Sequence, residues 1–202
     1  APLTRTDAGI VYILYDRTTA DWSLLNNTSI SAASSLTQIQ GAAGSDKLGN
    51  GSLAMGQTPR SDALAGTKED LLIGAPDADA SKGKAYLIHN VQASTPSTLD
   101  LASSGSVTTF TSGGTHADKF GASVDLGKDA DGDADTVPDI LIGAPQAINS
   151  ENEEAAGKVY LFKGKTFHII PHNGIPLIFW EDELDWIRFP LQYIFQRWTT
   201  TA

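Results

Sequence analysis

The chain of 202 residues contains no cysteine, so no disulfide can stabilise it and no thiol can act as a nucleophile. Positive charge is also scarce, because 14 Lys and Arg residues face 24 Asp and Glu residues, for a net charge of −10. Proteins that bind nucleic acid neutralise phosphates with clustered Lys and Arg, and the sequence has no such cluster. We therefore expect no nucleic-acid partner.

Long hydrophobic runs are absent as well. In the aromatic C-terminal part, the longest stretch without Asp, Glu, Lys or Arg is 166–180, which also contains two His and two Pro. A membrane-spanning helix needs about 20 predominantly apolar residues, so membrane insertion is not expected. Hydrophobic residues nevertheless make up 41% of the chain, which is enough for a buried core.

Catalytic motifs are missing too. The sequence has no Gly-x-Ser-x-Gly motif and no glycine loop of the phosphate-binding kind. His168 and His172 are four residues apart, but Pro171 separates them and no zinc-protease glutamate accompanies them. We therefore expect a non-enzymatic protein.

What the sequence does contain is an internal repeat of roughly 70 residues. A Gly-x-x-Tyr segment occurs three times, and an apolar-Gly-Ala-Pro segment and an Asp-Lys-x-Gly segment occur twice each. The copies are DAGIVYILY (7–15), SKGKAYLIH (81–89) and AAGKVYLFK (155–163); EDLLIGAP (69–76) and PDILIGAP (138–145); DKLGNGSLAMG (46–56) and DKFGASVDLG (118–127). The order of the three segments is the same in each unit.

Each of these segments predicts a β-strand. They are short, rich in β-branched or aromatic residues, and bounded by Gly, Pro, Asp and Ser. The proline of Gly-Ala-Pro ends strand pairing, because it cannot donate a hydrogen bond to the ladder. Residues 1–165 show no helical periodicity, so we expect an all-β protein built from repeated four-stranded sheets.

The stretch KFGASVDLGKDADGDADTVPDILIGAP, followed by GKVYLF, resembles the FG-GAP repeat of integrin α-subunit β-propellers and of many bacterial surface proteins. The resemblance covers about residues 1–165. It implies two to three four-stranded antiparallel blades that form an incomplete propeller. It also implies an extracellular or cell-surface protein that serves adhesion or protein–protein interaction, with a protein or glycan as its ligand.

In that family, the loop before the Gly-Ala-Pro strand binds calcium. The corresponding loop here, 129–139, holds five aspartates in eleven residues. Ca²⁺ prefers six to eight oxygen ligands, and without a cation these carboxylates would repel one another. The resemblance implies that the ligands are Asp131, Asp133, Asp135, the carbonyl of Val137, and Asp139.

One position departs from the family pattern, because Thr136 stands where the family usually has glycine. An alternative register would use Asp129, Asp131 and Asp133 together with Asp139.

The matching loop of the previous repeat, 57–70, differs. It has aspartates only at the matching ends, Asp62 and Asp70, while Leu64 and Gly66 occupy the intervening ligand positions. We expect no ion there.

The tail does not continue the repeat. From Lys163 onward it holds eight of the sixteen aromatic residues of the chain: Phe167, Phe179, Trp180, Trp186, Phe189, Tyr193, Phe195 and Trp198. Because such a surface would be too apolar to stay exposed, we expect the tail to dock on β-sheet surface of its own chain or of another copy. Pro190 suits the first turn of a short helix over 190–198.

The sequence therefore predicts a β-repeat domain over 1–165 and an aromatic-rich docking or assembly element over 166–202. A family propeller has seven blades, whereas this chain has material for two to three. Open sheets invite further pairing, so the alternative function is a structural subunit of a homo-oligomeric or filamentous extracellular assembly.

Overall fold

We describe the protein from a computed structural model. The structure describes residues 5–15, 36–57, 69–91, 98–105, 107–130, 138–148, 155–164, 167–172 and 175–180. It divides the chain into two compact units, Ala1–Gly164 and Lys165–Ala202.

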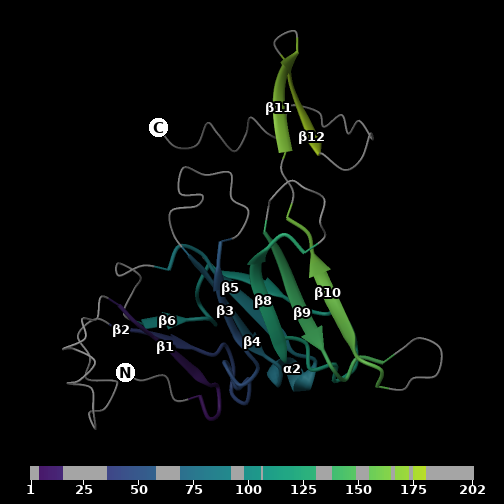
Figure 1. Cartoon of the computed structure of the whole chain (residues 1–202). Helices are drawn as coiled ribbons and strands as arrows, with labels where there is room; N and C mark the ends of the chain where they lie inside the picture. The colour runs from purple at the N-terminus through teal and green to yellow at the C-terminus, as the bar shows by residue number, and fades with distance from the viewer. Residues whose placement is uncertain are drawn as a thin grey trace. The chain divides into compact units, whose positions relative to one another are not determined.

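The described residues of the first unit form three sheets (Figure 1). The central sheet is a four-stranded antiparallel meander in the order β3-β4-β5-β7. Its strands are β3 (Leu53–Gly56), β4 (Asp70–Ala75), β5 (Lys84–Ile88) and β7 (Val107–Phe110). The protein is therefore all-β, as the sequence predicts.

The two other sheets have three strands each. One has the order β10-β9-β8 and consists of β8 (Ser123–Lys128), β9 (Asp139–Ala144) and β10 (Lys158–Phe162). The other has the order β1-β2-β6 and consists of β1 (Ile10–Leu14), β2 (Leu36–Gln40) and β6 (Thr98–Asp100), which runs parallel to β2. Among the described residues, four antiparallel strands thus occur in one sheet only, and no sheet closes on itself.

The one helical turn in the described residues, α2 (Ala78–Ser81), follows the Gly-Ala-Pro end of β4. Asp79 and Ala80 inside it have positive φ, so the segment is a tight bend and not a regular helix. This bend reverses the chain so that β5 can pair antiparallel with β4.

The core that the described residues form consists of two apolar clusters, one on each face of the central sheet. Side chains alternate between the faces of a strand, so neighbouring residues of β4 enter different clusters. Ile73 packs with Val11 and Ile39 from β1 and β2, whereas Leu72 packs with Ile140 and Ile142 from β9. The central sheet therefore lies between the two three-stranded sheets.

Neighbouring sheets meet through the same joint twice. At the first joint, the backbone N–H of Leu48 donates to the carbonyl of Ala8, at 2.9 Å. At the second, the N–H of Phe120 donates to the carbonyl of Lys82, at 3.0 Å. In both, the Asp-Lys-x-Gly loop of one repeat sits on the Gly-x-x-Tyr turn of the preceding repeat. The sequence repeat is thus a repeat of contacts as well.

A glycine is required at this joint. Gly83 has φ +88°, and a Cβ there would overlap the backbone of Phe120. Gly9, at the first joint, has φ +78° and would meet the backbone of Leu48 in the same way. This close approach explains why a glycine recurs at the equivalent position of the next repeat, 74 residues later.

In the second unit, β11 (Phe167–His172) and β12 (Ile175–Trp180) form an antiparallel hairpin in which Pro171 lies opposite Pro176. Because prolines cannot donate, the two facing prolines suit a non-hydrogen-bonded pair of the ladder. The helix predicted over 190–198 lies outside the described residues.

Candidate functional site

The predicted calcium loop ends at Asp139, the first residue of β9. This aspartate is buried, with 3% of its surface exposed. Its Oδ2 accepts a hydrogen bond from the backbone N–H of Ala130 at 2.8 Å, and its Oδ1 accepts one from the N–H of Gly164 at 2.7 Å. One carboxylate therefore ties the start of the loop and the end of β10 to the base of β9.

Asp129, which belongs to the alternative register, is exposed and lies near Asp139. A small cavity of about 110 Å³ is lined by residues of β8, of β9 and of positions 129–130, and its lining includes three carboxylates: Asp125, Asp129 and Asp139. Within the described ranges, no group of three or more His, Asp or Glu side chains is close enough to hold a metal ion. The remaining predicted ligands, Asp131, Asp133, Asp135 and Val137, lie outside the described residues.

The previous repeat uses its matching aspartate in the same structural way. Asp70 begins β4 and is buried, and its Oδ1 accepts a hydrogen bond from the N–H of Asn90 at 2.7 Å. Its Oδ2 lies 3.3 Å from Nδ1 of His89, whose Nε2 is 3.2 Å from the hydroxyl of Thr108. Asp62, Leu64 and Gly66 fall outside the described residues. Asp70 thus has the same anchoring role as Asp139, with a histidine beside it.

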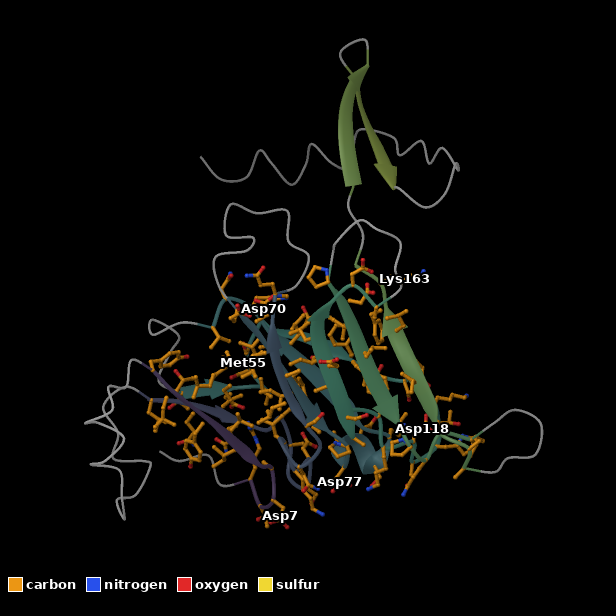
Figure 2. The ribbon with its side chains drawn as sticks, in the orientation of Figure 1. Asp7, Met55, Asp70, Asp77, Asp118 and Lys163 are labelled. Carbon is orange, nitrogen blue, oxygen red and sulfur yellow. The ribbon has the colours of Figure 1, made fainter. Side chains whose placement is uncertain are left out.

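A second group of charged side chains lies at the other end of the sheets from Asp70. Figure 2 shows Asp70 and Lys163 at one end of the sheets and Asp77 and Asp118 at the other. Asp77 follows the Gly-Ala-Pro of β4 and forms ion pairs with Lys119 and with Lys47, the latter at 3.1 Å. Hydrogen bonds from Lys119 and then from Lys47 lower the pKa of Asp77 below its ordinary value. Because Lys119 comes from the next repeat, this aspartate joins two repeats.

A hollow of about 620 Å³ surrounds these ion pairs. It is lined by Asp7, Ala43, Gly44, Ser45, Asp46, Lys47, Asp77, Asp79, Ala80, Ser81 and Lys119. Aspartates of this hollow form hydrogen bonds or ion pairs within the protein. Asp46, for example, accepts a hydrogen bond from the N–H of Ala43 at 2.8 Å. The hollow therefore marks the joint between repeats.

The charge of each Asp-Lys-x-Gly aspartate also acts on a tyrosine of its own repeat. Burial, followed by the charge of Asp46, raises the pKa of Tyr86 to about 12. Burial, followed by the charge of Asp118, raises the pKa of Tyr160 in the same direction. The Tyr86 hydroxyl is buried and has no hydrogen-bond partner in the described part of the chain. Neither tyrosine is set up as an acid or base near neutral pH.

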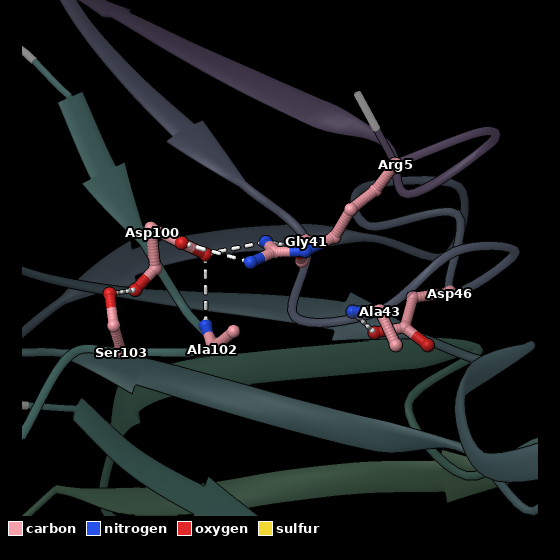
Figure 3. Close-up of polar contacts among 7 residues, drawn as sticks. All are labelled: Arg5, Gly41, Ala43, Asp46, Asp100, Ala102 and Ser103. Atoms are coloured by element: carbon pink, nitrogen blue, oxygen red, sulfur yellow. Dashed lines mark hydrogen bonds and ion pairs between the residues drawn. The ribbon is translucent and has the colours of Figure 1, made fainter. Parts of the chain in front are cut away.

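A third polar contact holds the first sheet (Figure 3). Arg5 donates to both carboxylate oxygens of Asp100, at 2.6 and 2.9 Å, and to the carbonyl of Gly41, at 2.8 Å. The N–H of Ala102 also donates to Asp100, at 3.0 Å. The hydrogen bond from Arg5 is the main cause that lowers the pKa of Asp100. This clamp fixes β6 against the turn before β1.

Sequence reasoning missed the Asp77 and Arg5 contacts. The Asp77 pairs had a usable signal, because Lys47 and Lys119 occupy the same position of the repeated Asp-Lys-x-Gly segment. The Arg5–Asp100 pair joins positions 95 residues apart and falls in no repeated segment, so the sequence carried no signal for it.

No described helix is long and apolar enough to cross a membrane. In comparisons with known proteins, no protein-family model matches the chain and no curated protein matches it.

Proposed function

We propose that this chain is a non-enzymatic, calcium-stabilised extracellular β-repeat protein of the FG-GAP type, which serves adhesion or protein–protein interaction by binding a protein or glycan ligand. In this proposal the stacked sheets are blades of an incomplete propeller. The observation that carries it is the joint that occurs twice, at Leu48 on Ala8 and at Phe120 on Lys82. The side-by-side placement of β3 and β8, the first strands of their sheets, supports the same arrangement.

The buried carboxylate of Asp139 supports the calcium part of the proposal. The predicted ligands precede Asp139 directly in the sequence, and the orientation of this buried carboxylate is fixed by two backbone N–H groups. In this proposal the ion is held by Asp131, Asp133 and Asp135, by the carbonyl of Val137, and by Asp139, with Asp129 as the alternative ligand. An ion there would neutralise the loop and stabilise the folded state by about 3–4 kcal/mol, if free calcium exceeds the Kd by 100–1,000-fold.

The test is thermal unfolding of the full chain in calcium and in EGTA. We expect EGTA to lower the Tm of the wild-type protein, and Asp133→Ala to remove most of that difference. The matched control is Asp62→Asn in the preceding loop, which should leave both the calcium stoichiometry and the effect of EGTA unchanged. The proposal fails if the wild-type protein melts at the same temperature in calcium and in EGTA.

A second candidate function is a structural subunit of a homo-oligomeric or filamentous assembly. The observation that favours it is the outer face of the β10-β9-β8 sheet. Val159 and Leu161 are 73% and 39% exposed there, whereas their repeat counterparts Ala85 and Leu87 are buried under the next sheet. A copy of the chain is one candidate to cover this face.

Light scattering of the native protein separates the two functions. A monomer at every accessible concentration contradicts the structural subunit. A defined oligomer that Val159→Lys dissociates supports it, because a lysine on the exposed face prevents sheet stacking without disturbing a buried residue.

A further inference from the structure

The outer edge of β10 differs from the equivalent edges in the other two sheets. Each Gly-x-x-Tyr strand is the third strand of its repeat, and an antiparallel fourth strand covers it in two cases: β2 pairs with β1, and β7 pairs with β5. β10 pairs with β9 on one side and, within the described residues, has no strand on its other side. Its edge N–H and C=O groups are therefore a template for a further strand.

The two covering strands use one register. The repeat tyrosines lie opposite polar residues, in the pairs Tyr12–Gln38 and Tyr86–Thr109. The residue after each tyrosine lies opposite a threonine, in the pairs Ile13–Thr37 and Leu87–Thr108. The register thus follows from the repeat and predicts which residues would face β10.

The two covering strands also share a sequence pattern. They read Leu-Thr-Gln-Ile (36–39) and Val-Thr-Thr-Phe (107–110), which is an aliphatic residue, a threonine, a polar residue and a large apolar residue. Their last residues, Ile39 and Phe110, pack into the apolar clusters between sheets. The pattern therefore combines a sheet edge with a side chain that reaches the core.

The side chains of β10 favour the same kind of partner. Tyr160 and Phe162 pack against the central sheet, and Phe162 stacks edge-on against Phe110, with ring centroids 4.9 Å apart. Val159 and Leu161, on the opposite face, are exposed. An added strand would cover apolar surface beside Tyr160 and Phe162 on one face and beside Val159 and Leu161 on the other. Its main-chain hydrogen bonds with β10 would supply affinity.

We propose that β10 binds an extended segment of another polypeptide as a fourth, antiparallel strand, with the sequence pattern aliphatic–Thr–polar–large apolar. The aliphatic residue lies opposite Phe162, the threonine opposite Leu161, the polar residue opposite Tyr160, and the large apolar residue opposite Val159. The proposed strand addition does not depend on calcium in the 129–139 loop.

The absence of cysteine makes the register directly testable. The probes are two peptides of residues 106–111, one carrying Thr108→Cys and the other Thr109→Cys, each with its cysteine activated as a disulfide with thionitrobenzoate. They are offered to the full chain with Leu161→Cys, whose thiolate attacks the peptide sulfur and releases thionitrobenzoate. The cysteines of the two peptides point to opposite faces of a strand. In the proposed register, only the cysteine of the Thr108→Cys peptide lies beside the cysteine that Leu161→Cys introduces. We expect the first peptide to form the mixed disulfide about tenfold faster than the second.

Ala102→Cys, on an exposed turn, is the matched control and should react with both peptides slowly and equally. Should Leu161→Cys fail to fold by circular dichroism, Val159→Cys with a Phe110→Cys peptide tests the neighbouring predicted pair. Equal rates for the two peptides, or no disulfide at all because the chain's own residues cover the edge, overturn the proposal. Repeating the reaction in EGTA separates its failure from failure of the calcium proposal.

Discussion

Aspartates at the ends of strands organise this protein at the scale of single residues. Asp70 and Asp139 each begin a Gly-Ala-Pro strand and accept a backbone N–H from just beyond the next strand, at 2.7 Å in both cases. Hydrogen bonds to an ionised carboxylate are stronger than neutral ones, which allows these buried charges. Their first role is therefore structural, and calcium would add to an anchor that is already in place at Asp139.

The Asp77 ion pairs predict a pH-dependent contribution to stability. The folded-state pKa of Asp77 lies below its ordinary value of 3.8. The pairs therefore add stability above about pH 4, and this contribution disappears as the pH falls through the folded-state pKa. Because Lys47 is half exposed, we expect Asp77→Asn to lower the free energy of unfolding by about 1 kcal/mol at pH 7.

Urea unfolding of both proteins from pH 7 to pH 2.5 measures this difference. The two curves should converge at the acidic end. Asp79→Asn is the matched control, because Asp79 is exposed and pairs only with Lys82 among the contacts described, at 3.6 Å. A difference that stays constant over the whole pH range would contradict a role for the ionised Asp77.

Tyr86 predicts a stabilising substitution. Its buried hydroxyl has no hydrogen-bond partner among the described residues, and such a group costs free energy in the folded state. We expect Tyr86→Phe to raise the free energy of unfolding by about 1 kcal/mol. Tyr160→Phe, in the less buried equivalent position, should change it by less than about 0.5 kcal/mol. A clear loss of stability in Tyr86→Phe would mean that the hydroxyl has a partner in the native protein.

At the scale of elements, the joint between sheets depends on backbone approach at the repeated glycine. Gly83 and Gly157 share a positive φ, of +88° and +75°, but differ in their surroundings. A Cβ at Gly83 would overlap Phe120, whereas a Cβ at Gly157 would meet only the carbonyl oxygen of Pro145 at a tight distance, 3.3 Å. The comparison of the two positions therefore separates backbone strain from loss of the joint.

We expect Gly157→Ala to cost about 1–2 kcal/mol, from the strained backbone alone. Gly83→Ala should cost clearly more, about 3 kcal/mol or above, because the added methyl group also forces two sheets apart. Chemical denaturation of the two variants measures the comparison. Equal costs would mean that the joint contributes nothing beyond the backbone conformation of its glycine.

The strands could be predicted where a repeated segment is also an apolar segment that becomes buried. Asp-apolar-Gly-Ala-Pro and Gly-x-x-Tyr each became a strand, because four apolar residues bounded by Gly and Pro are too few for a helix and suit a buried strand. The fourth strands β2 and β7 lie outside the recognised segments, and their shared threonine pattern emerges only from the register. The hairpin β11–β12 was missed, although Asn173-Gly174 between two apolar runs is a common hairpin signal.

The candidate site was predictable only in part. Of its residues, only Asp129 and Asp139 are among those that the structure describes, and both line one cavity. The backbone partners of Asp139 come from Ala130 and from Gly164, 25 residues away, and no local pattern specifies the second contact. Long-range contacts of this kind depend on how sheets stack, which spacing alone does not determine.

At the scale of the whole molecule, the first unit leaves apolar side chains exposed on two of its sheets. Leu53 and Met55 of β3 are 52% and 57% exposed, on the face that the first sheet covers elsewhere, and Val159 and Leu161 are exposed on the far sheet. An exposed apolar face at the outer side of the stack, such as that of Val159 and Leu161, suits association with a further sheet. Stacking is therefore the route to self-association that the first unit itself offers.

The last prediction concerns the aromatic tail of residues 166–202, which falls outside the repeat. Its eight aromatic residues can each bury about 150–250 Å², so together they can remove on the order of 1,000 Å² from water. This is the scale of a specific protein interface, so we expect self-association to depend on the tail. Truncation after Lys165 removes it close to the boundary between the two compact units and leaves the three sheets intact.

Light scattering of the truncated and full-length proteins, at equal concentration and in calcium, measures the effect. We expect the truncated protein to form smaller particles, because the large apolar contribution to association is gone. Restoring the tail with Trp186→Ser and Trp198→Ser is the matched variant, which keeps the chain length but reduces the aromatic surface. A truncated protein that stays soluble at the same oligomeric size would show that the exposed faces of the first unit, and not the tail, hold the assembly together.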